Sequence, residues 1–165
     1  DRLEKIDGVI TPRVPPDRTH AYYLYPVEID QAKLNLETEP GRLRNAVVHA
    51  LAAENVRAGQ WQKVPVPAQP MFQNKRAYGK GCPWTCRGDG EVSYDLANYP
   101  NSFSALENSF TVRGLVPPNG TELVDAYAAA FEKVFGNIDR VLAAYDRKEQ
   151  FIPLEERIDA LKLGA

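Results

Sequence analysis

The chain has 165 residues and a formal net charge of -2, with 44% hydrophobic and 25% charged residues. This size suits one domain with a real core, and the composition is that of an ordinary globular protein. Sequence-independent binding of nucleic acid requires a basic surface, and the sequence contains no run of basic residues that would form such a surface. No apolar stretch approaches the roughly 18 residues that would span a bilayer, so we expect neither nucleic acid nor a membrane as partner.

The N-terminal residues D-R-L-E-K-I-D-G-V are charged and lack the apolar centre of a signal peptide, so a cytoplasmic protein is expected. They resemble the last turns of a helix, because Leu3 and Ile6 share a face and Gly8 stands where a stop residue would. We therefore expect a fragment whose residues 1–18 connect to an absent N-terminal domain. A native protein with a short first helix is the alternative.

The first long elements are a strand and a helix. Alternating polarity predicts a strand over residues 22–29, and Pro26 indicates that this part of it lies at an edge or a bulge. A 3.6-residue period predicts a helix over residues 41–55, with Arg44 among the polar residues around its apolar stripe. The strand should turn four side chains toward the core: Tyr23, Tyr25, Val27 and Ile29.

The middle of the chain alternates short elements with loops. Residues 56–61 are predicted as a short strand or an extended exit from the helix, and the prolines of residues 63–71 indicate a fixed extended loop. The glycine-rich residues 74–98 have no regular pattern, which is typical of a functional or poorly ordered loop. A short helix over residues 100–109 and a strand over residues 110–113 follow.

The strongest helical pattern begins after Asn119, which stands three residues before Glu122 as the N-cap of a capping box. Gly136 and Asn137 interrupt its period, and a last amphipathic helix is predicted over residues 154–163. Elements in this order predict an α+β fold with a small, mainly antiparallel sheet covered by helices. The buried stripe of the strong helix should be Val124, Tyr127, Phe131, Val134 and Phe135.

Residues 19–72 contain T-H-A-Y-Y-L-Y-P-V, then a helical stretch, then N-V-R-A-G-Q-W-Q-K-V-P-V-P-A-Q-P-M-F. In this order they resemble the C-terminal domain of the DegT/StrS-type pyridoxal-phosphate-dependent sugar and cyclitol aminotransferases. The resemblance makes residues 19–145 the small domain of a fold-type-I enzyme and residues 146–165 a helical tail. It implies that the complete enzyme, a homodimer, moves an amino group from glutamate or glutamine to a keto-sugar or keto-cyclitol.

The resemblance also implies pyridoxal phosphate in the complete enzyme, but none of the eight lysines stands in the family's Schiff-base motif. We therefore expect that lysine in an N-terminal cofactor-binding domain, on the same or a separate chain, and no cofactor on this chain alone. Without the N-terminal cofactor-binding domain, this chain should expose apolar surface around Leu3 and Ile6 and at Met71 and Phe72. The alternatives are a free-standing module that binds carbohydrate without chemistry and an assembly subunit.

No residue of this chain is expected to be catalytic or to bind the cofactor. The resemblance points to Trp61 and Gln62 as substrate-facing residues. The indole face of Trp61 suits the C–H surface of a sugar ring, and the amide of Gln62 can bond hydroxyls as both donor and acceptor. Arg57 or Lys63 would meet a nucleotide phosphate if the substrate carries one. In the alternative view, Trp61 is a core aromatic and His20 only packs beneath its neighbouring tyrosines. By the resemblance, the substrate-facing residues are His20, Tyr22, Trp61, Gln62, Lys63, Met71 and Phe72.

Two cysteines, Cys82 and Cys86, stand in the glycine-rich loop on either side of Trp84. We expect two thiols, because a disulfide across so short a loop would be strained and the cytoplasm keeps thiols reduced. Half of a zinc site, completed by His20 and His49, is the weaker alternative.

Overall fold

The computed structural model describes residues 2–78, 81–86 and 92–163 of the chain. Residues 79–80 and 87–91 of the expected glycine-rich loop lie outside the described residues. In the described part the protein is α+β, with six α-helices and a four-stranded antiparallel sheet, as the sequence predicts.

The chain forms two compact units. Unit 1 comprises residues 1–61 and 107–151, and unit 2 comprises residues 62–106 and 152–165. The sheet and the larger core belong to unit 1.

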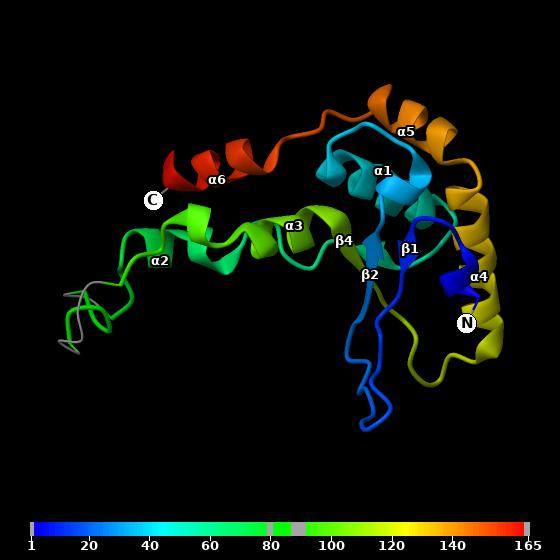
Figure 1. The fold of residues 1–165 in the computed structure, drawn as a ribbon, viewed down its shortest axis with the longest axis horizontal. Helices are drawn as coiled ribbons and strands as arrows, with labels where there is room; N and C mark the ends of the chain where they lie inside the picture. Colours follow the sequence, from blue (N-terminus) through cyan, green and yellow to red (C-terminus); the bar gives the residue numbers. More distant parts are fainter. Residues whose placement is uncertain (1, 79–80, 87–91, 164–165) are drawn as a thin grey trace. The chain divides into compact units, whose positions relative to one another are not determined.

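The sheet of unit 1 has the strand order β1-β2-β4-β3, with every neighbouring pair antiparallel (Figure 1). The last strand in the chain therefore lies between two earlier ones. Val112 of β4 is opposite Tyr25 of β2 on one side and Ala58 of β3 on the other. The strands are β1 (Val9–Ile10), β2 (Tyr25–Ile29), β3 (Ala58–Gly59) and β4 (Ser109–Val112).

The strand β2 is shorter than the sequence predicts. Tyr22 has a φ of 49°, in the left-handed region, where a residue cannot continue a strand. Tyr23 is consequently 83% exposed, and its predicted core position is wrong. Pro26 is paired with β4, while β1 pairs only with the last two residues of β2. At Pro26 the strand has one neighbour, and this is the edge-like position that a proline tolerates.

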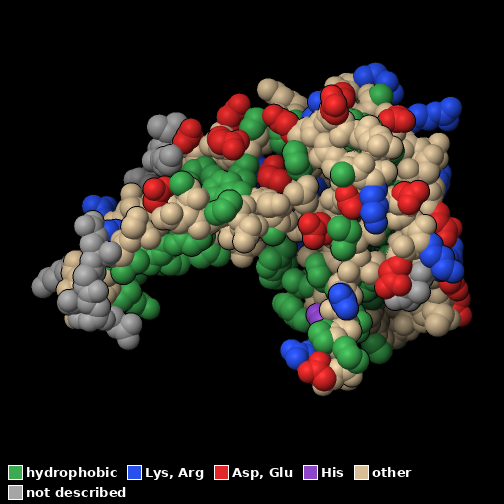
Figure 2. All heavy atoms as spheres, viewed as in Figure 1, with side chains coloured by type: hydrophobic (Ala, Val, Ile, Leu, Met, Phe, Trp, Pro, Cys, Tyr) green, Lys and Arg blue, Asp and Glu red, His purple; other side chains and the backbone are tan. Residues whose placement is uncertain are grey.

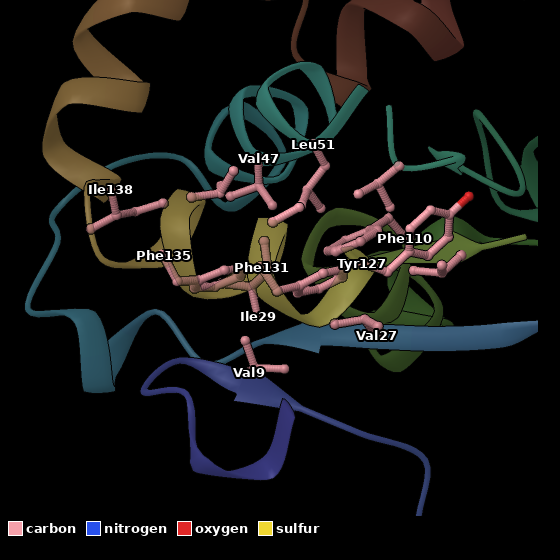
Figure 3. Close-up of a cluster of buried hydrophobic side chains, with 14 of the residues drawn as sticks. Val9, Val27, Ile29, Val47, Leu51, Phe110, Tyr127, Phe131, Phe135 and Ile138 are labelled. Carbon is pink, nitrogen blue, oxygen red and sulfur yellow. The ribbon is translucent and has the colours of Figure 1, made fainter. Parts of the chain in front are cut away.

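Three helices build the core of unit 1 together with the sheet: α1 (Pro40–Ala53), α4 (Thr121–Phe135) and α5 (Ile138–Asp146). Proline at the first position of α1 suits a helix start, because its missing N–H would have no partner there. Side chains from α1, α4 and β2 point toward one another in Figure 3. The most deeply buried apolar side chains are Val27, Leu43, Val47, Leu51, Phe110 and Phe131.

The helix α4 confirms the predicted stripe except at its beginning. Val124 is 50% exposed, whereas the four later stripe residues are buried. The predicted capping box is wrong: Gly120 is the N-cap, without a side-chain hydrogen bond to the helix. Asn119 instead donates from Nδ2 to the carbonyl of Gly114, 2.8 Å away. The side chain of an asparagine can form a hydrogen bond with the preceding turn as readily as with the following helix. In this protein, Asn119 bonds to the preceding turn.

Arg44 of α1 is completely buried, which corrects its predicted place on the polar side of the helix. Its Nη1 lies 3.6 Å from Oε1 of Glu107, and Asn45 Oδ1 accepts hydrogen bonds from its Nε and Nη2. A Cβ on Gly41 would collide with the Glu107 carboxylate, so the glycine makes room for this ion pair at the start of the helix. A buried charge is tolerated only when it is paired in this way.

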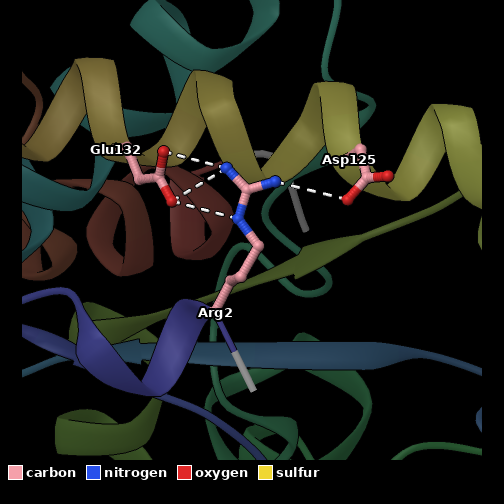
Figure 4. A network of polar contacts seen from close by, with 3 residues as sticks. All are labelled: Arg2, Asp125 and Glu132. Carbon is pink, nitrogen blue, oxygen red and sulfur yellow. Dashed lines mark hydrogen bonds and ion pairs between the residues drawn. The ribbon is translucent and has the colours of Figure 1, made fainter.

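The N-terminal residues pack onto α4 (Figure 4). Arg2 donates from Nε and Nη2 to the carboxylate of Glu132 and from Nη1 to Asp125. These contacts with Glu132, before those with Asp125, raise the pKa of Arg2. Leu3, in the short 3₁₀ turn Leu3–Lys5, and Ile6 are half-buried against the core, so the apolar patch expected around them is not there.

Unit 2 has a smaller core of its own, formed by Val64, Ala68, Leu154 and Ile158. The predicted extended loop of residues 63–71 is wrong, because its prolines begin short helical segments, a role that proline also suits. Besides the 3₁₀ turns Val66–Ala68 and Leu96–Asn98, the helices of this part are α2 (Pro70–Gln73), α3 (Pro100–Asn108, which reaches into unit 1) and α6 (Leu154–Leu163).

Candidate functional site

An open groove of about 510 Å³ lies in unit 1, at the end of the sheet where β2 begins and β4 ends. Three tyrosines and a tryptophan contribute to it, together with one arginine and the turn that follows β4. We call it the aromatic groove. Its lining residues are Tyr22, Tyr23, Leu24, Tyr25, Trp61, Val112, Arg113, Gly114, Leu115 and Val116.

The indole of Trp61 contributes apolar surface to the aromatic groove. It is 51% exposed, so the alternative that Trp61 is a core aromatic is wrong. The ring of Tyr23 meets it edge-on, with centroids 6.4 Å apart and planes at 85°. The Arg113 guanidinium carbon lies 5.9 Å from the centroid of the indole, within the range of a cation–π contact. The indole is thus held by neighbours while half of its surface stays open.

His20 and Tyr22 precede β2. The backbone N–H of Tyr22 donates to Nδ1 of His20 at 2.7 Å, and the two rings lie 4.5 Å apart. Tyr22 in turn stacks on Tyr25, with centroids 6.1 Å apart. His20 is not among the residues that line the groove, so the structure gives it the packing position that we considered as the alternative. It supports the turn that presents Tyr22.

The other predicted site residues belong to unit 2. Gln62, Lys63 and Met71 are exposed, and the carbonyl of Lys63 accepts a hydrogen bond of 2.8 Å from Arg157. Phe72 is half-buried, because its ring packs edge-on against Trp84 and Tyr94. The structure therefore brings Tyr22 and Trp61 together in unit 1 and gives Phe72 a packing role in unit 2. The apolar surface expected at Met71 and Phe72 is limited to Met71.

Arg113 is a member of the groove that the sequence does not single out. It follows β4 directly and is exposed. Its backbone N–H donates to the carbonyl of Arg57 at 2.9 Å, which carries the β3–β4 pairing one residue beyond the regular strands. The only signal in the sequence is a basic residue at the end of a predicted strand, and such residues are common at strand ends.

Cys82 and Cys86 form a disulfide, with Cα atoms 5.4 Å apart, which corrects the expectation of two thiols. This separation is within the usual range for disulfides. In the described part of the chain, no three His, Cys, Asp or Glu side chains come close enough to hold a metal ion. The cysteines are bonded to each other, so the alternative of a zinc half-site is wrong for this state of the protein.

A second cavity, of about 280 Å³, lies on the α4 side of the sheet. Its lining includes the apolar side chains of Val124, Leu115 and Phe131 and the charged side chains of Arg2 and Asp125. Tyr25 lines both this cavity and the aromatic groove. Burial, followed by the charges of Tyr22 and Glu4, raises the pKa of the Tyr25 phenol.

Pyridoxal phosphate requires a lysine amine for its imine and, in most enzymes, a carboxylate against its pyridine nitrogen. The residues that line the aromatic groove include neither. The groove therefore does not fit the reactive end of this cofactor. What the groove offers is aromatic surface, tyrosine hydroxyls and one guanidinium.

No protein-family model matches the chain, and no curated protein matches it. Among the described residues, no helix has the length and apolar character needed to cross a membrane. On the face shown in Figure 2, acidic and basic side chains are interspersed over unit 1 rather than gathered by sign.

Proposed function

We propose that this chain is the C-terminal domain of a pyridoxal-phosphate-dependent aminotransferase and that its aromatic groove forms one wall of the substrate cleft. The complete enzyme would move an amino group from glutamate or glutamine to a keto-sugar or keto-cyclitol. A separate cofactor-binding domain, on the same or another chain, would supply the lysine. The complete enzyme would be a homodimer.

The observation that carries this proposal is the exposed indole of Trp61 in a groove with Tyr22 and Tyr23. Sugars and cyclitols present flat C–H faces, which pack well on aromatic rings, and hydroxyls, which bond to phenols. An indole held in place by Tyr23 and Arg113 loses little conformational freedom when a ring binds. The role of this chain would be to bind and orient the substrate ring.

A second function is favoured by the lack of any lysine or carboxylate among the lining residues. A groove that binds a ring and holds no acid–base group suits a carbohydrate-binding or assembly module that performs no chemistry. The reading frame upstream of Asp1 distinguishes the aminotransferase domain from the non-catalytic module. A family lysine motif in that frame supports the aminotransferase, whereas a start codon immediately before Asp1 supports the module.

The aminotransferase proposal places the protein in the cytoplasm, where we expect its amino donor. The disulfide between Cys82 and Cys86 is at odds with that location, because cytosolic thiols are usually kept reduced. In a cytoplasmic protein this bond would form only transiently or after isolation. The proposal does not depend on it, because the aromatic groove lies in unit 1 and the cysteines in unit 2.

Ring binding is tested directly on the 165-residue chain. The sequence has two tryptophans, so Trp84→Phe leaves Trp61 as the only indole, and its Nε1–H signal can be followed by nuclear magnetic resonance. Titration with scyllo-inosose or glucose should shift that signal with millimolar affinity. A glycerol titration serves as the control for general solvent effects. A signal that responds equally to glycerol, or to none of the ligands, contradicts the proposed function.

A further inference from the structure

The two cysteines of unit 2 lie on a single turn of the backbone. The N–H of Thr85 donates to the carbonyl of Gly81, and the N–H of Tyr78 donates to the carbonyl of Cys82, both at 3.1 Å. Side chains four residues apart on such a turn are neighbours, as Cys82 and Cys86 are. The backbone hydrogen bonds therefore keep the two sulfur-bearing side chains close to each other whether or not the covalent bond is present.

The disulfide is open to solvent and lies apart from the core of its unit. Cys86 is an exposed residue and Cys82 is half-buried. Neither belongs to the buried cluster of unit 2, which is formed by side chains from other segments. A bond that closes so short a loop removes little freedom from the unfolded chain, so it adds less stability than a bond between distant residues. Exposed disulfides are the labile ones, because exchange requires access to sulfur.

The closed loop also holds an aromatic side chain against the rest of unit 2. Trp84 lies between the two cysteines, and its Nε1 donates to the hydroxyl of Tyr94 at 2.9 Å. Its ring meets that of Phe72 edge-on, with centroids 6.1 Å apart, and Phe72 and Tyr94 lie 5.3 Å apart. The bond between Cys82 and Cys86 thus restrains the segment that presents Trp84 to these two rings.

We propose that Cys82 and Cys86 are a reversible redox site that exchanges with small thiols and disulfides of the glutathione class and changes how Trp84 packs. Disulfides of cytosolic proteins are usually transient and often sense redox state, and an accessible cysteine beside a resolving cysteine is the usual arrangement. This inference goes beyond the proposed function and does not depend on it.

Oxidation begins at the exposed cysteine. The Cys86 thiolate attacks one sulfur of glutathione disulfide, the bond between the two glutathione sulfurs breaks, and one glutathione thiolate leaves. The Cys82 thiolate then attacks the Cys86 sulfur of the mixed disulfide and displaces the second glutathione. The protein loses two thiol protons and two electrons, and one glutathione disulfide becomes two glutathione thiols. Reduction by two glutathione thiols is the reverse of these steps.

The first test follows Trp84 by nuclear magnetic resonance in the 165-residue chain with Trp61→Phe, which leaves Trp84 as the only indole. In buffers with different ratios of reduced to oxidised glutathione, we expect two Nε1–H signals whose populations change with the ratio and return when it is restored. The double variant with Cys82→Ser and Cys86→Ser should show one signal at every ratio. The Trp61 signal of the Trp84→Phe variant, which belongs to unit 1, is the matched control and should not respond.

The second test is the rate at which oxidised glutathione modifies single-cysteine variants, measured by mass spectrometry. Cys82→Ser should gain one glutathione on Cys86 at least ten times faster than Cys86→Ser gains one on the half-buried Cys82. Equal rates overturn the proposed order of attack. A bond that survives excess reduced glutathione overturns the redox site, as does a pair of thiols that stays reduced in excess oxidised glutathione. A Trp84 signal that is the same in both forms overturns the link to the aromatic rings.

Discussion

The guanidinium of Arg44 and the carboxylate of Glu107 form an ion pair, 3.6 Å apart, with Arg44 closed off from solvent. Removing one partner of a buried pair leaves a charge without compensation and typically costs about 3–5 kcal/mol. We expect Glu107→Ala to lower the free energy of unfolding by an amount of this order in urea denaturation. Asp146→Ala, which removes the partially exposed partner of Arg42, should cost less than about 1 kcal/mol. Similar losses in both variants would contradict the assigned role of Arg44.

Gly41→Ala should destabilise the protein, although the same change inside a helix usually stabilises it by about 1 kcal/mol. The reason is that the new methyl group would meet the Glu107 carboxylate, which cannot move without leaving Arg44. The change should become stabilising when it is made together with Glu107→Ala, because the obstacle is then gone. Gly59→Ala, with open space around the new atom, is the control. Unfolding free energies of the four variants give the sign directly.

If the chain belongs to the aminotransferase that we propose, Trp61→Ala should weaken use of the keto-substrate by an order of magnitude or more in the complete enzyme, since a lost pocket contact is worth roughly 1–3 kcal/mol. The thermal midpoint and the cofactor spectrum should change little, because half of the indole is already exposed. Steady-state kinetics and thermal unfolding of the same variant check both statements. An unchanged kcat/KM removes Trp61 from the site.

The stability of the protein should fall with rising pH in a way that depends on Tyr25. Its pKa is raised chiefly by burial, so the folded protein keeps this proton at a pH where the unfolded chain loses it. The stabilisation is complete below about pH 10, the pKa of an unperturbed tyrosine, and is lost as the pH rises further. Tyr25→Phe should therefore show a shallower loss of unfolding free energy between about pH 9 and 11. Tyr78→Phe, at an 84% exposed position, should match the parent protein.

The isolated chain should not form an internal aldimine with pyridoxal phosphate. Apart from the half-buried Lys75, the lysines whose surroundings are described are exposed, and the aromatic groove contains none. The absorption spectrum after mixing and dialysis is the measurement. A stoichiometric aldimine band that survives dialysis and disappears when a single lysine is changed would refute the prediction.

The longer helices could be predicted because their buried faces repeat in the sequence, whereas the four-residue helix α2 was too short for such a repeat. The stripe of α4 and its end at Gly136 follow from the period alone. The details that depend on single backbone angles could not: Tyr22 leaves the strand through its positive φ, and Asn119 bonds backward to Gly114 instead of capping the helix. Sequence patterns describe average preferences, whereas these choices are made by local hydrogen bonds.

The candidate site shows the same division. Tyr22 and Trp61 could be proposed from their residue types and their order along the chain. Arg113 could not, because its relation to Arg57 exists only through the antiparallel register of strands that are distant in sequence. The burial of Arg44 was hidden for a similar reason, since it depends on a carboxylate supplied by Glu107 at the end of α3.

The position of β4 at the centre of the sheet also bears on how the protein is made. The strands β1, β2 and β3 leave the ribosome first, but β3 has no neighbour other than β4 in the described sheet. Pairing between distant strands is slow, and an uncovered apolar face exposes a nascent chain to aggregation. Val27 and Ile29 remain without the cover of α4 until residues 121–135 have been synthesised. We therefore expect the sheet of unit 1 to form late, with the apolar faces of its early strands exposed in a growing chain that ends before residue 109.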